Sequence, residues 1–264
     1  MFAKLPLKDT ILHYVEEGTG DAFVFVHGSA ASMVHGQYLA KHLAGGNRFI
    51  SYSQRFHLPN NPAAPGAYTA DQHAEDLLEL LEQLNISHCN ILGHSYGCQV
   101  VLTAAIRQPE KFKKLYLAEP ALAFLINGKE EYKELMEERN DTFQRIKNCF
   151  DEGRSADAVA TLMRYANGAR GFIAFPEEIR WDMAANAAAL FRQVYETQQA
   201  TLNADLLATL QVPTTVLLGS QCTNMYRCVA EEMKKLLPDI IIKSIDNCAH
   251  DLIYLKADAI SKLL

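Results

Sequence analysis

Residues 91–100, ILGHSYGCQV, place a serine between two glycines at a sharp change of structure. The preceding run, HCNILGH, is short and almost wholly apolar, as is typical of a strand buried on both faces of a parallel sheet. The residues that follow are small and apolar, which favours a helix packed closely on that sheet. Gly93 and Gly97 complete the G-x-S-x-G pattern of a strained strand-to-helix turn that exposes its serine. We therefore predict that Ser95 is a nucleophile; the alternative is a serine that only caps the helix.

Outward from this turn, strand-like runs alternate with helical patterns along most of the chain. The predicted strands are ILHYVEE (11–17), AFVFVH (22–27), RFISYS (48–53), HCNILGH (88–94), KKLYLAEP (113–120), PTTVLLG (213–219) and IIIKSID (240–246). Helices are predicted over 74–84, directly after Ser95, over 226–237 and at the carboxyl terminus. This alternation predicts an α/β fold with a mainly parallel central sheet.

Strand patterns are missing between residues 121 and 202. Helical patterns cover 132–150, 156–165 and 177–199 instead, and the charged residues from Lys129 to Lys147 are explained most simply as a solvated helix face. We predict a helical cap over 121–202, inserted into a core made of residues 1–120 and 203–264.

Composition limits the possible partners and surroundings. The chain has 264 residues and a net charge of −6, from 31 acidic and 25 basic residues, which argues against nucleic acid or an anionic membrane as partner. Six scattered cysteines, no signal-like leader and no long apolar run predict a cytoplasmic protein with reduced thiols. No metal cluster or nucleotide fingerprint is evident, so we expect no metal and no cofactor. A monomer or a homodimer is expected.

Taken together, these features resemble an α/β-hydrolase with a helical cap, over nearly the whole chain. The segment VFVHGSAAS (24–32) is similar to the family's His-Gly oxyanion segment. The resemblance implies that the backbone N–H groups of Ser29 and Tyr96 face the developing oxyanion, with Gly28 beside the substrate. The alternative is that His27-Gly28 is only a tight exit from a strand.

The catalytic base is assigned by its position in the chain. His250, in IDNCAHDLIYL, follows the last predicted strand and precedes the last helix, where the family keeps its catalytic histidine. Ala249 replaces the glycine usual before it. Each of the other histidines lies outside the order Ser, acid, His, and the side chain of His94 is expected to point away.

The acid is missing from its usual position. In most α/β-hydrolases an Asp follows the strand before the last, and that alignment falls on Cys222, whose thiol is a poor substitute for a carboxylate. Asp246 is close to His250 in sequence but poorly placed. Glu119 ends the strand next to the nucleophile strand, and its Glu-Pro pair resembles that of the zearalenone-type lactonases. We predict Glu119 as the acid; the alternative is a solvated residue at the start of the cap.

Two groups of residues are candidate substrate contacts. Arg55 and His57 lie in a loop that is beside the site in many family members, where they either contact substrate or only shape the loop. Apolar cap residues either line a pocket or form the core of the cap, and Trp181 is our nominated contact. These cap residues are Met163, Tyr165, Phe172, Phe175, Trp181, Met183 and Phe191.

The resulting hypothesis is a serine hydrolase that cleaves an uncharged, medium-sized hydrophobic ester or lactone through Ser95, His250 and Glu119. Two alternatives stay open. One is a hydrolase of carbon–carbon bonds with the same fold, and the other is a ligand-binding receptor that retains the triad.

Overall fold

The computed structural model describes residues 1–196 and 201–264. Its centre is an eight-stranded sheet in the order β1-β2-β4-β3-β5-β6-β7-β8. Pairing is parallel from β4 to β8, whereas β1 and β2 are added antiparallel at one edge. The strands are β1 (Phe2–Pro6), β2 (Ile11–Glu17), β3 (Asp21–Val26), β4 (Asn47–Tyr52), β5 (Cys89–His94), β6 (Phe112–Ala118), β7 (Thr214–Gly219) and β8 (Ile241–Ile245).

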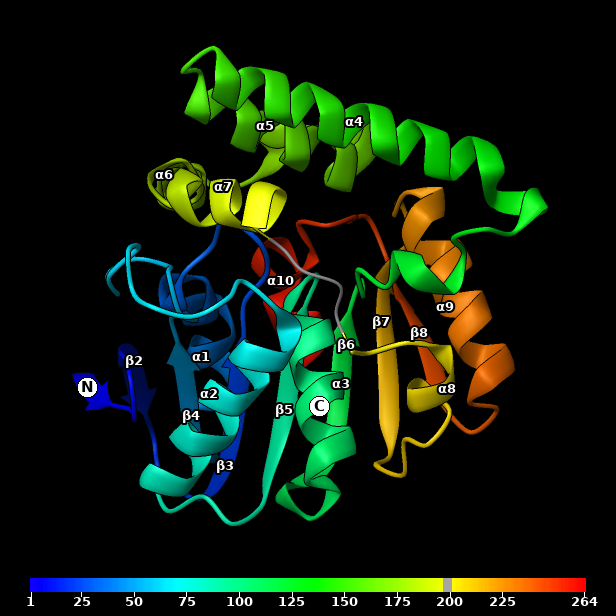
Figure 1. The fold of residues 1–264 in the computed structure, drawn as a ribbon. Coiled ribbons are helices and arrows are strands. Elements are labelled where there is room, and N and C mark those ends of the chain that lie inside the picture. The colour runs from blue at the N-terminus through cyan, green and yellow to red at the C-terminus, as the bar shows by residue number, and fades with distance from the viewer. Residues whose placement is uncertain (197–200) are drawn as a thin grey trace.

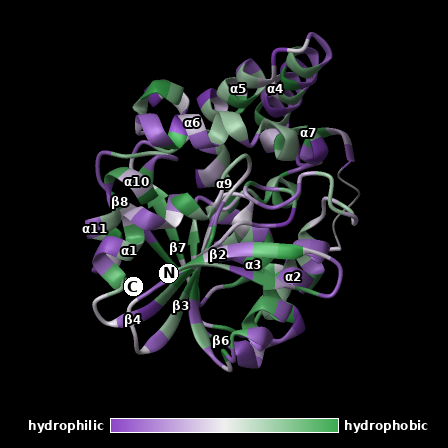
Figure 2. Ribbon diagram, turned by 90° about the vertical axis from the view of Figure 1, so that its left-hand side faces the viewer, coloured by the Kyte–Doolittle hydropathy of each residue, from purple (hydrophilic) through white to green (hydrophobic). Residues whose placement is uncertain are grey.

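The predicted α/β fold with a mainly parallel sheet is confirmed, and each of the seven predicted strands overlaps a strand of this sheet. The apolar colour runs through the central strands in Figure 2, as expected for strands covered on both faces. β1 was not predicted. Its side chains alternate between exposed and half-buried, so FAKLP carries no continuous apolar signal.

Helices cover both faces of the sheet (Figure 1). On one face, apolar side chains of α2, α3 and α9 pack on alternate residues of the strands, such as Val24 and Leu117. On the other face, α1, α10 and α11 pack on the intervening residues, such as Phe25 and Tyr116. These helices, with the short α8, are α1 (Gln37–Leu43), α2 (Ala70–Gln83), α3 (Gly97–Arg107), α8 (Ala204–Leu207), α9 (Asn224–Leu236), α10 (Leu252–Leu255) and α11 (Ala257–Ser261).

Four helices lie together across the carboxyl ends of the parallel strands, at the top of Figure 1. They are α4 (Lys133–Asp151), α5 (Ser155–Asn167), α6 (Glu177–Ala185) and α7 (Ala187–Glu196). The single helix predicted over 177–199 is two helices, because the chain breaks at Asn186, and its residues 197–199 lie outside the described part of the chain.

The side-chain amide of Asn186 explains why this break is stable. It donates to the carbonyl of Asp182 (2.8 Å), and its oxygen accepts from the N–H of Leu58 (2.7 Å). Free backbone groups at a helix end need such partners. The break therefore fastens the cap to a core loop.

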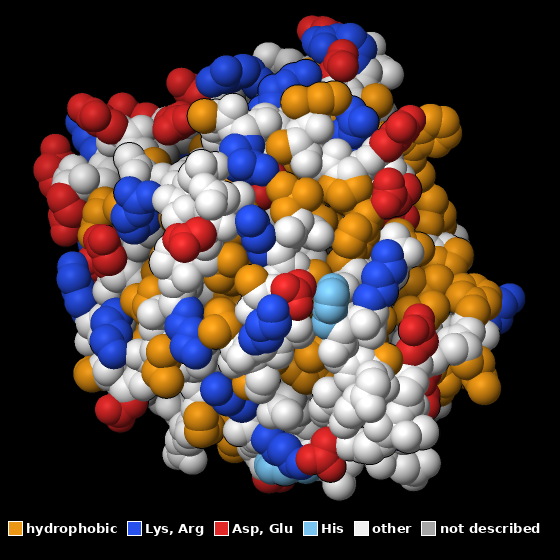
Figure 3. All heavy atoms as spheres, turned by 180° about the vertical axis from the view of Figure 1, so that it is seen from behind, with side chains coloured by type: hydrophobic (Ala, Val, Ile, Leu, Met, Phe, Trp, Pro, Cys, Tyr) orange, Lys and Arg blue, Asp and Glu red, His pale blue; other side chains and the backbone are white. Residues whose placement is uncertain are grey.

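The molecular surface is mixed in character. Seen from behind, acidic and basic side chains are interspersed with apolar ones (Figure 3). Within the two described ranges, no helix has the length and apolar content needed to cross a membrane.

Candidate active site

Ser95 lies at the turn between β5 and α3, in the conformation that the glycines around it permit. Its φ is 55°, in the left-handed region that non-glycine residues rarely occupy. A Cβ at Gly93 would come within 2.8 Å of the Gly97 carbonyl oxygen, and one at Gly97 within 2.4 Å of the Val26 carbonyl oxygen. The strand and helix therefore approach too closely for side chains at either position. Strain of this kind, held in place by its surroundings, is typical of functional sites.

Glu119 and His250 form a buried pair at the same edge of the sheet. Oε2 of Glu119 lies 2.8 Å from Nδ1 of His250, and Oε1 accepts a 3.1 Å hydrogen bond from the backbone N–H of Gly219. Glu119 is fully buried and His250 is 3% exposed. The carboxylate is thus held on both oxygens, and it can fix the imidazole with its proton on Nδ1 and its lone pair on Nε2.

The other ring nitrogen of His250 faces the cavity that contains Ser95. Nε2 lies 3.5 Å from the hydroxyl of Tyr226, which also contacts the side chain of Ser95. Among the described residues no hydrogen bond joins Ser95 directly to His250, and catalytic hydrogen bonds are often long before substrate binds. Burial, followed by the negative charge of Glu119, raises the pKa of Tyr226, so its hydroxyl stays protonated.

Two rings pack against the imidazole of His250. The ring of Tyr226 is stacked on it with centroids 4.7 Å apart and an interplanar angle of 12°, and the His94 ring lies 4.5 Å away. Burial, and then the proximity of His250, lower the pKa of His94 well below its usual value, so His94 is neutral. His250 therefore has its ring plane fixed by neighbours that add no charge. His94 was expected to point away from the site, yet its ring lies against His250.

The predicted oxyanion segment is next to Ser95. A Cβ on Gly28 would lie 2.9 Å from Cβ of Ser95, so only glycine fits there. Ser29 and Tyr96 both line the cavity beside Ser95. Within the described part of the chain, neither backbone N–H donates a hydrogen bond. Both groups are thus available to a ligand oxygen.

In the described part of the chain, neither of the two competing acid candidates is hydrogen-bonded to Nδ1 of His250, whose partner is Glu119. Cys222 is buried, and burial together with the negative charge of Glu119 raises the pKa of its thiol. A thiol held in its neutral form cannot supply the negative charge that a triad acid needs. Asp246 is exposed just after the end of β8.

A cavity of about 90 Å³ connects Ser95 and His250 with the cap. Most of its lining is apolar, which agrees with the expected character of the pocket. The cap contributes side chains from α4, α5 and α7, namely Arg139, Phe143, Leu162, Met163, Tyr165, Ala166 and Gln193. Met163 and Tyr165 were among the expected candidates, whereas Arg139 and Gln193 were not.

The prediction that Trp181 contacts substrate is wrong in this structure. Trp181 is 71% exposed and is not part of the cavity lining. Ile179 and Met183 carry the inward face of α6. Each is two residues from Trp181, which is about 200° around a helix of 3.6 residues per turn, so Trp181 points outward.

Arg55 and His57 have structural roles. The guanidinium of Arg55 is buried and binds the carboxylate of Asp76 through Nε (2.8 Å) and Nη2 (2.6 Å). His57 contacts the Ala31 carbonyl (2.7 Å) and the hydroxyl of Tyr68 (3.1 Å). Burial lowers the pKa of His57 to about 4. Neither side chain lines the cavity with Ser95.

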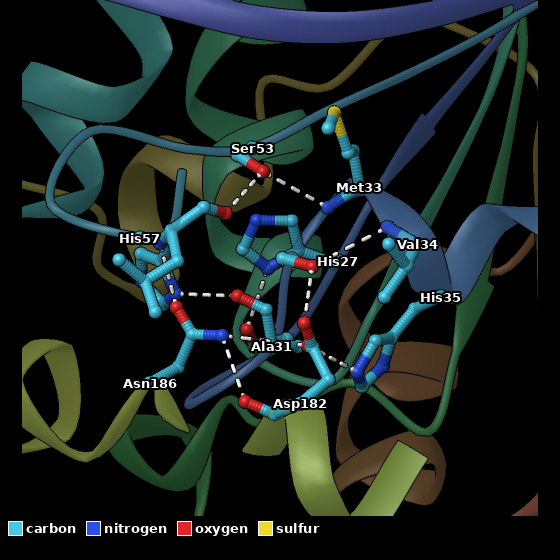
Figure 4. Close-up of polar contacts among 12 residues, drawn as sticks. His27, Ala31, Met33, Val34, His35, Ser53, His57, Asp182 and Asn186 are labelled. Atoms are coloured by element: carbon cyan, nitrogen blue, oxygen red, sulfur yellow. Dashed lines mark hydrogen bonds and ion pairs between the residues drawn. The ribbon is translucent and has the colours of Figure 1, made fainter. Parts of the chain in front are cut away.

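A polar cluster joins the cap to the core beside the oxyanion segment (Figure 4). Asp182 of α6 accepts a 2.7 Å hydrogen bond from Ser32 and pairs with Nε2 of His35 at 2.9 Å. His35 also contacts the hydroxyl of Tyr254 at 2.6 Å. These contacts fix α6 relative to the loop that carries Ser29, which is the predicted oxyanion segment.

Tyr226 and Arg139 were missed by the sequence analysis. The sequence pattern predicts Tyr226 only as the start of a helix and Arg139 only as part of a solvated charged face. No local pattern separates a cavity-facing residue from its neighbours on an amphipathic helix. Among the described residues, no group of three or more His, Cys, Asp and Glu side chains is arranged to hold a metal ion.

Comparison with known proteins identifies relatives of this fold. Residues 21–257 match the family model described as the alpha/beta hydrolase fold. The uncharacterized hydrolase YraK of Bacillus subtilis is 29% identical over 120 residues, 45% of this chain and 44% of that protein. An epoxide hydrolase of Caballeronia sordidicola is 28% identical over 204 residues, 75% of this chain and 60% of that protein. The matches thus span less than two thirds of either relative.

A solved structure agrees with this chain over almost its full length. Est816, described as an N-acyl homoserine lactone degrading enzyme, superposes with a TM-score of 0.77 at 17% identity, covering 99% of this chain and 98% of its own. At this identity the likeness shows the fold alone. The similarity to zearalenone-type lactonases stays a prediction.

Proposed function

Because the chain belongs to the α/β-hydrolase fold family, we propose that it is a serine hydrolase that cleaves a carboxylic ester or lactone. The observation that carries the proposal is the buried 2.8 Å contact between Glu119 and His250, with the strained Ser95 in the same cavity. A nucleophile, a base and a group that orients the base are the three parts that acyl transfer requires.

The reaction begins when Ser95 Oγ attacks the carbonyl carbon and His250 Nε2 accepts its proton. The carboxylate of Glu119 stabilises the imidazolium that forms. The N–H groups of Ser29 and Tyr96 stabilise the negative oxygen, and each such donor contributes about 3 kcal/mol in well-studied enzymes. His250 then protonates the leaving alkoxide. Water, activated by the same histidine, releases the acid from Ser95.

The cavity supports a small substrate with a largely apolar body. Its volume of about 90 Å³ is smaller than the roughly 150 Å³ of an engineered apolar cavity that binds benzene. Leu162, Met163 and Phe143 line it on the cap side. The likeness of Glu119-Pro120 to zearalenone-type lactonases favours lactones within this class.

Covalent labelling with a fluorophosphonate probe, followed by hydrolysis of a panel of small esters and lactones, tests the proposal. The wild type should be labelled and should turn over, and Ser95→Ala should lose both properties because only the attacking oxygen is removed. Loss of a triad member lowers kcat by about 10³-fold or more. Ser155→Ala, at an exposed position on the cap, is the matched control. Activity of Ser95→Ala within tenfold of wild type would contradict the assignment.

A further inference from the structure

Arg139 places a positive charge on the wall of the proposed active-site cavity. It lies on α4 of the cap and is partly buried, and it lines the same cavity as Ser95 and His250. In the described part of the chain, no carboxylate lies within ion-pair distance of its guanidinium, and none of its N–H groups donates a hydrogen bond to the protein. Six of the ten other arginines have a carboxylate partner in the described part of the chain, whereas Arg139 has none and faces the cavity that contains Ser95.

The ring of Phe143 orients this guanidinium. The central carbon of the Arg139 guanidinium lies 4.4 Å from the centre of that ring, one helical turn further along α4. A guanidinium stacked on an aromatic face keeps its N–H donors at its edge, where they can form a fork that fits a carboxylate. Burial lowers the pKa of Arg139, which reflects a charge taken partly out of water without an anion to offset that cost.

Tyr165 supplies a second donor from a neighbouring helix. It lies on α5 and lines the same cavity. Its hydroxyl oxygen is buried and has no hydrogen-bond partner among the described residues. Burial raises the pKa of Tyr165, so the hydroxyl remains a donor. The positive charge of Arg139 is close enough to act on this pKa in the opposite direction, with a smaller effect. A buried hydroxyl without a partner is costly unless a ligand satisfies it.

We propose that Arg139 and Tyr165 form a subsite that binds a carboxylate at the far end of the substrate from the bond that is cleaved. The inference rests on the proposed function, because it takes Ser95 as the attacking group. It replaces the expected uncharged substrate with a small ester or lactone that has an apolar middle and one anionic end. A single guanidinium and one hydroxyl match the charge of a carboxylate better than that of a phosphate dianion.

Monomethyl succinate and methyl 4-methylpentanoate provide a matched pair of substrates. They differ only at the far end, where one has a carboxylate and the other an isopropyl group of similar shape. In Arg139→Gln, the ratio of kcat/KM for the charged over the neutral ester should fall by about 10- to 100-fold, mainly through KM, since hydrogen bonds to charged groups are worth that much. Tyr165→Phe should lower the ratio by about 2- to 10-fold.

Arg145→Gln is the control for the loss of charge. Arg145 lies on the same helix but is exposed outside the cavity, so its ratio should stay within twofold of wild type. Arg139→Lys should restore part of the ratio, because the charge returns without the fork. An Arg139→Gln ratio equal to wild type would overturn the subsite.

A binding measurement separates this subsite from the proposed function. Succinate is titrated calorimetrically into Ser95→Ala, with and without Arg139→Gln. Binding that weakens at least tenfold with Arg139→Gln supports the subsite even if neither ester is hydrolysed, an outcome that would overturn only the proposed function. Succinate affinity that is the same in both variants overturns the subsite, whether or not the esters are cleaved by the wild type.

Discussion

Replacing Glu119 by glutamine tests how His250 is oriented. In the structure, one carboxylate oxygen faces Nδ1 of His250 at 2.8 Å and the other faces the N–H of Gly219 at 3.1 Å. The side-chain amide of the Glu119→Gln variant would have the same shape but one acceptor and one donor in place of two acceptors. If its NH₂ faces His250, then Nδ1 must accept, the ring proton moves to Nε2, and the histidine cannot take a proton from Ser95.

The opposite orientation of the amide is also unfavourable. Its NH₂ would then face the N–H of Gly219 in a fully buried site, and an unsatisfied buried donor costs about 1–3 kcal/mol. The variant also loses the carboxylate's attraction for imidazolium, which is about 4 kcal/mol for charges 4 Å apart at an effective dielectric constant of 20. We therefore expect a fall in kcat of about 10³- to 10⁴-fold, equivalent to about 4–5.5 kcal/mol.

The assay is steady-state hydrolysis of a small ester, together with circular dichroism to verify the fold. Cys222→Ala and Asp246→Asn are the controls, because these residues occupy the other two candidate positions for an acid; each should change kcat by less than tenfold. A fall of less than tenfold in Glu119→Gln, or a larger fall in either control, would refute the reasoning.

Three further predictions address the surroundings of the site. Tyr226→Phe keeps the ring stacked on His250 and should lower kcat by less than tenfold, whereas Tyr226→Ala should lower it by more; equal losses in steady-state assays would contradict a role for the stack. The folded-state pKa of His57, about 4, lies below the unfolded value near 6.5, so folding favours the neutral ring and its contribution is lost as the pH falls through this window. Urea unfolding should show the free energy of unfolding falling by up to about 1.4 kcal/mol per pH unit from this residue between pH 6.5 and 5, and less steeply in His57→Asn. Trp181→Ala should leave KM for small and bulky esters within twofold, and a selective rise for the bulky ester would return Trp181 to the binding site.

The central sheet could be predicted because its strands are buried on both faces and are therefore continuously apolar. β5 and β6 are examples: CNILGH and FKKLYLA have few polar residues apart from those at their ends. The turn at Ser95 could also be predicted from the sequence, because its geometry leaves no room for a side chain at position 93 or 97 and therefore requires glycine at both. The adjacency of β5 and β6 then brings Glu119 to the edge where Ser95 emerges.

The cap could be predicted as helical, but not in the direction that its side chains face. The predictions for Trp181 and for Arg139 both differ from the structure for this reason. An amphipathic pattern identifies which face of a helix is apolar, but it does not distinguish packing on the cap's own core from packing around a cavity. Arg139 belongs to a charged run and still lines the cavity, because one edge of α4 lies over Ser95.

The proposed role of Glu119 as the acid would account for the unusual residues after β7. With Glu119, directly after β6, as the proposed acid, the turn after Gly219 need not carry a carboxylate, and Cys222 occupies the position that would otherwise hold one. The end of β7 still supports the acid, because the N–H of Gly219 donates to Glu119. This segment leads into α9, where the ring of Tyr226 is stacked on that of His250 with the ring centroids 4.7 Å apart. In the proposed site, one strand end thus contributes a backbone donor and the other the charge, while the helix between β7 and β8 supplies the ring that fixes the orientation of His250.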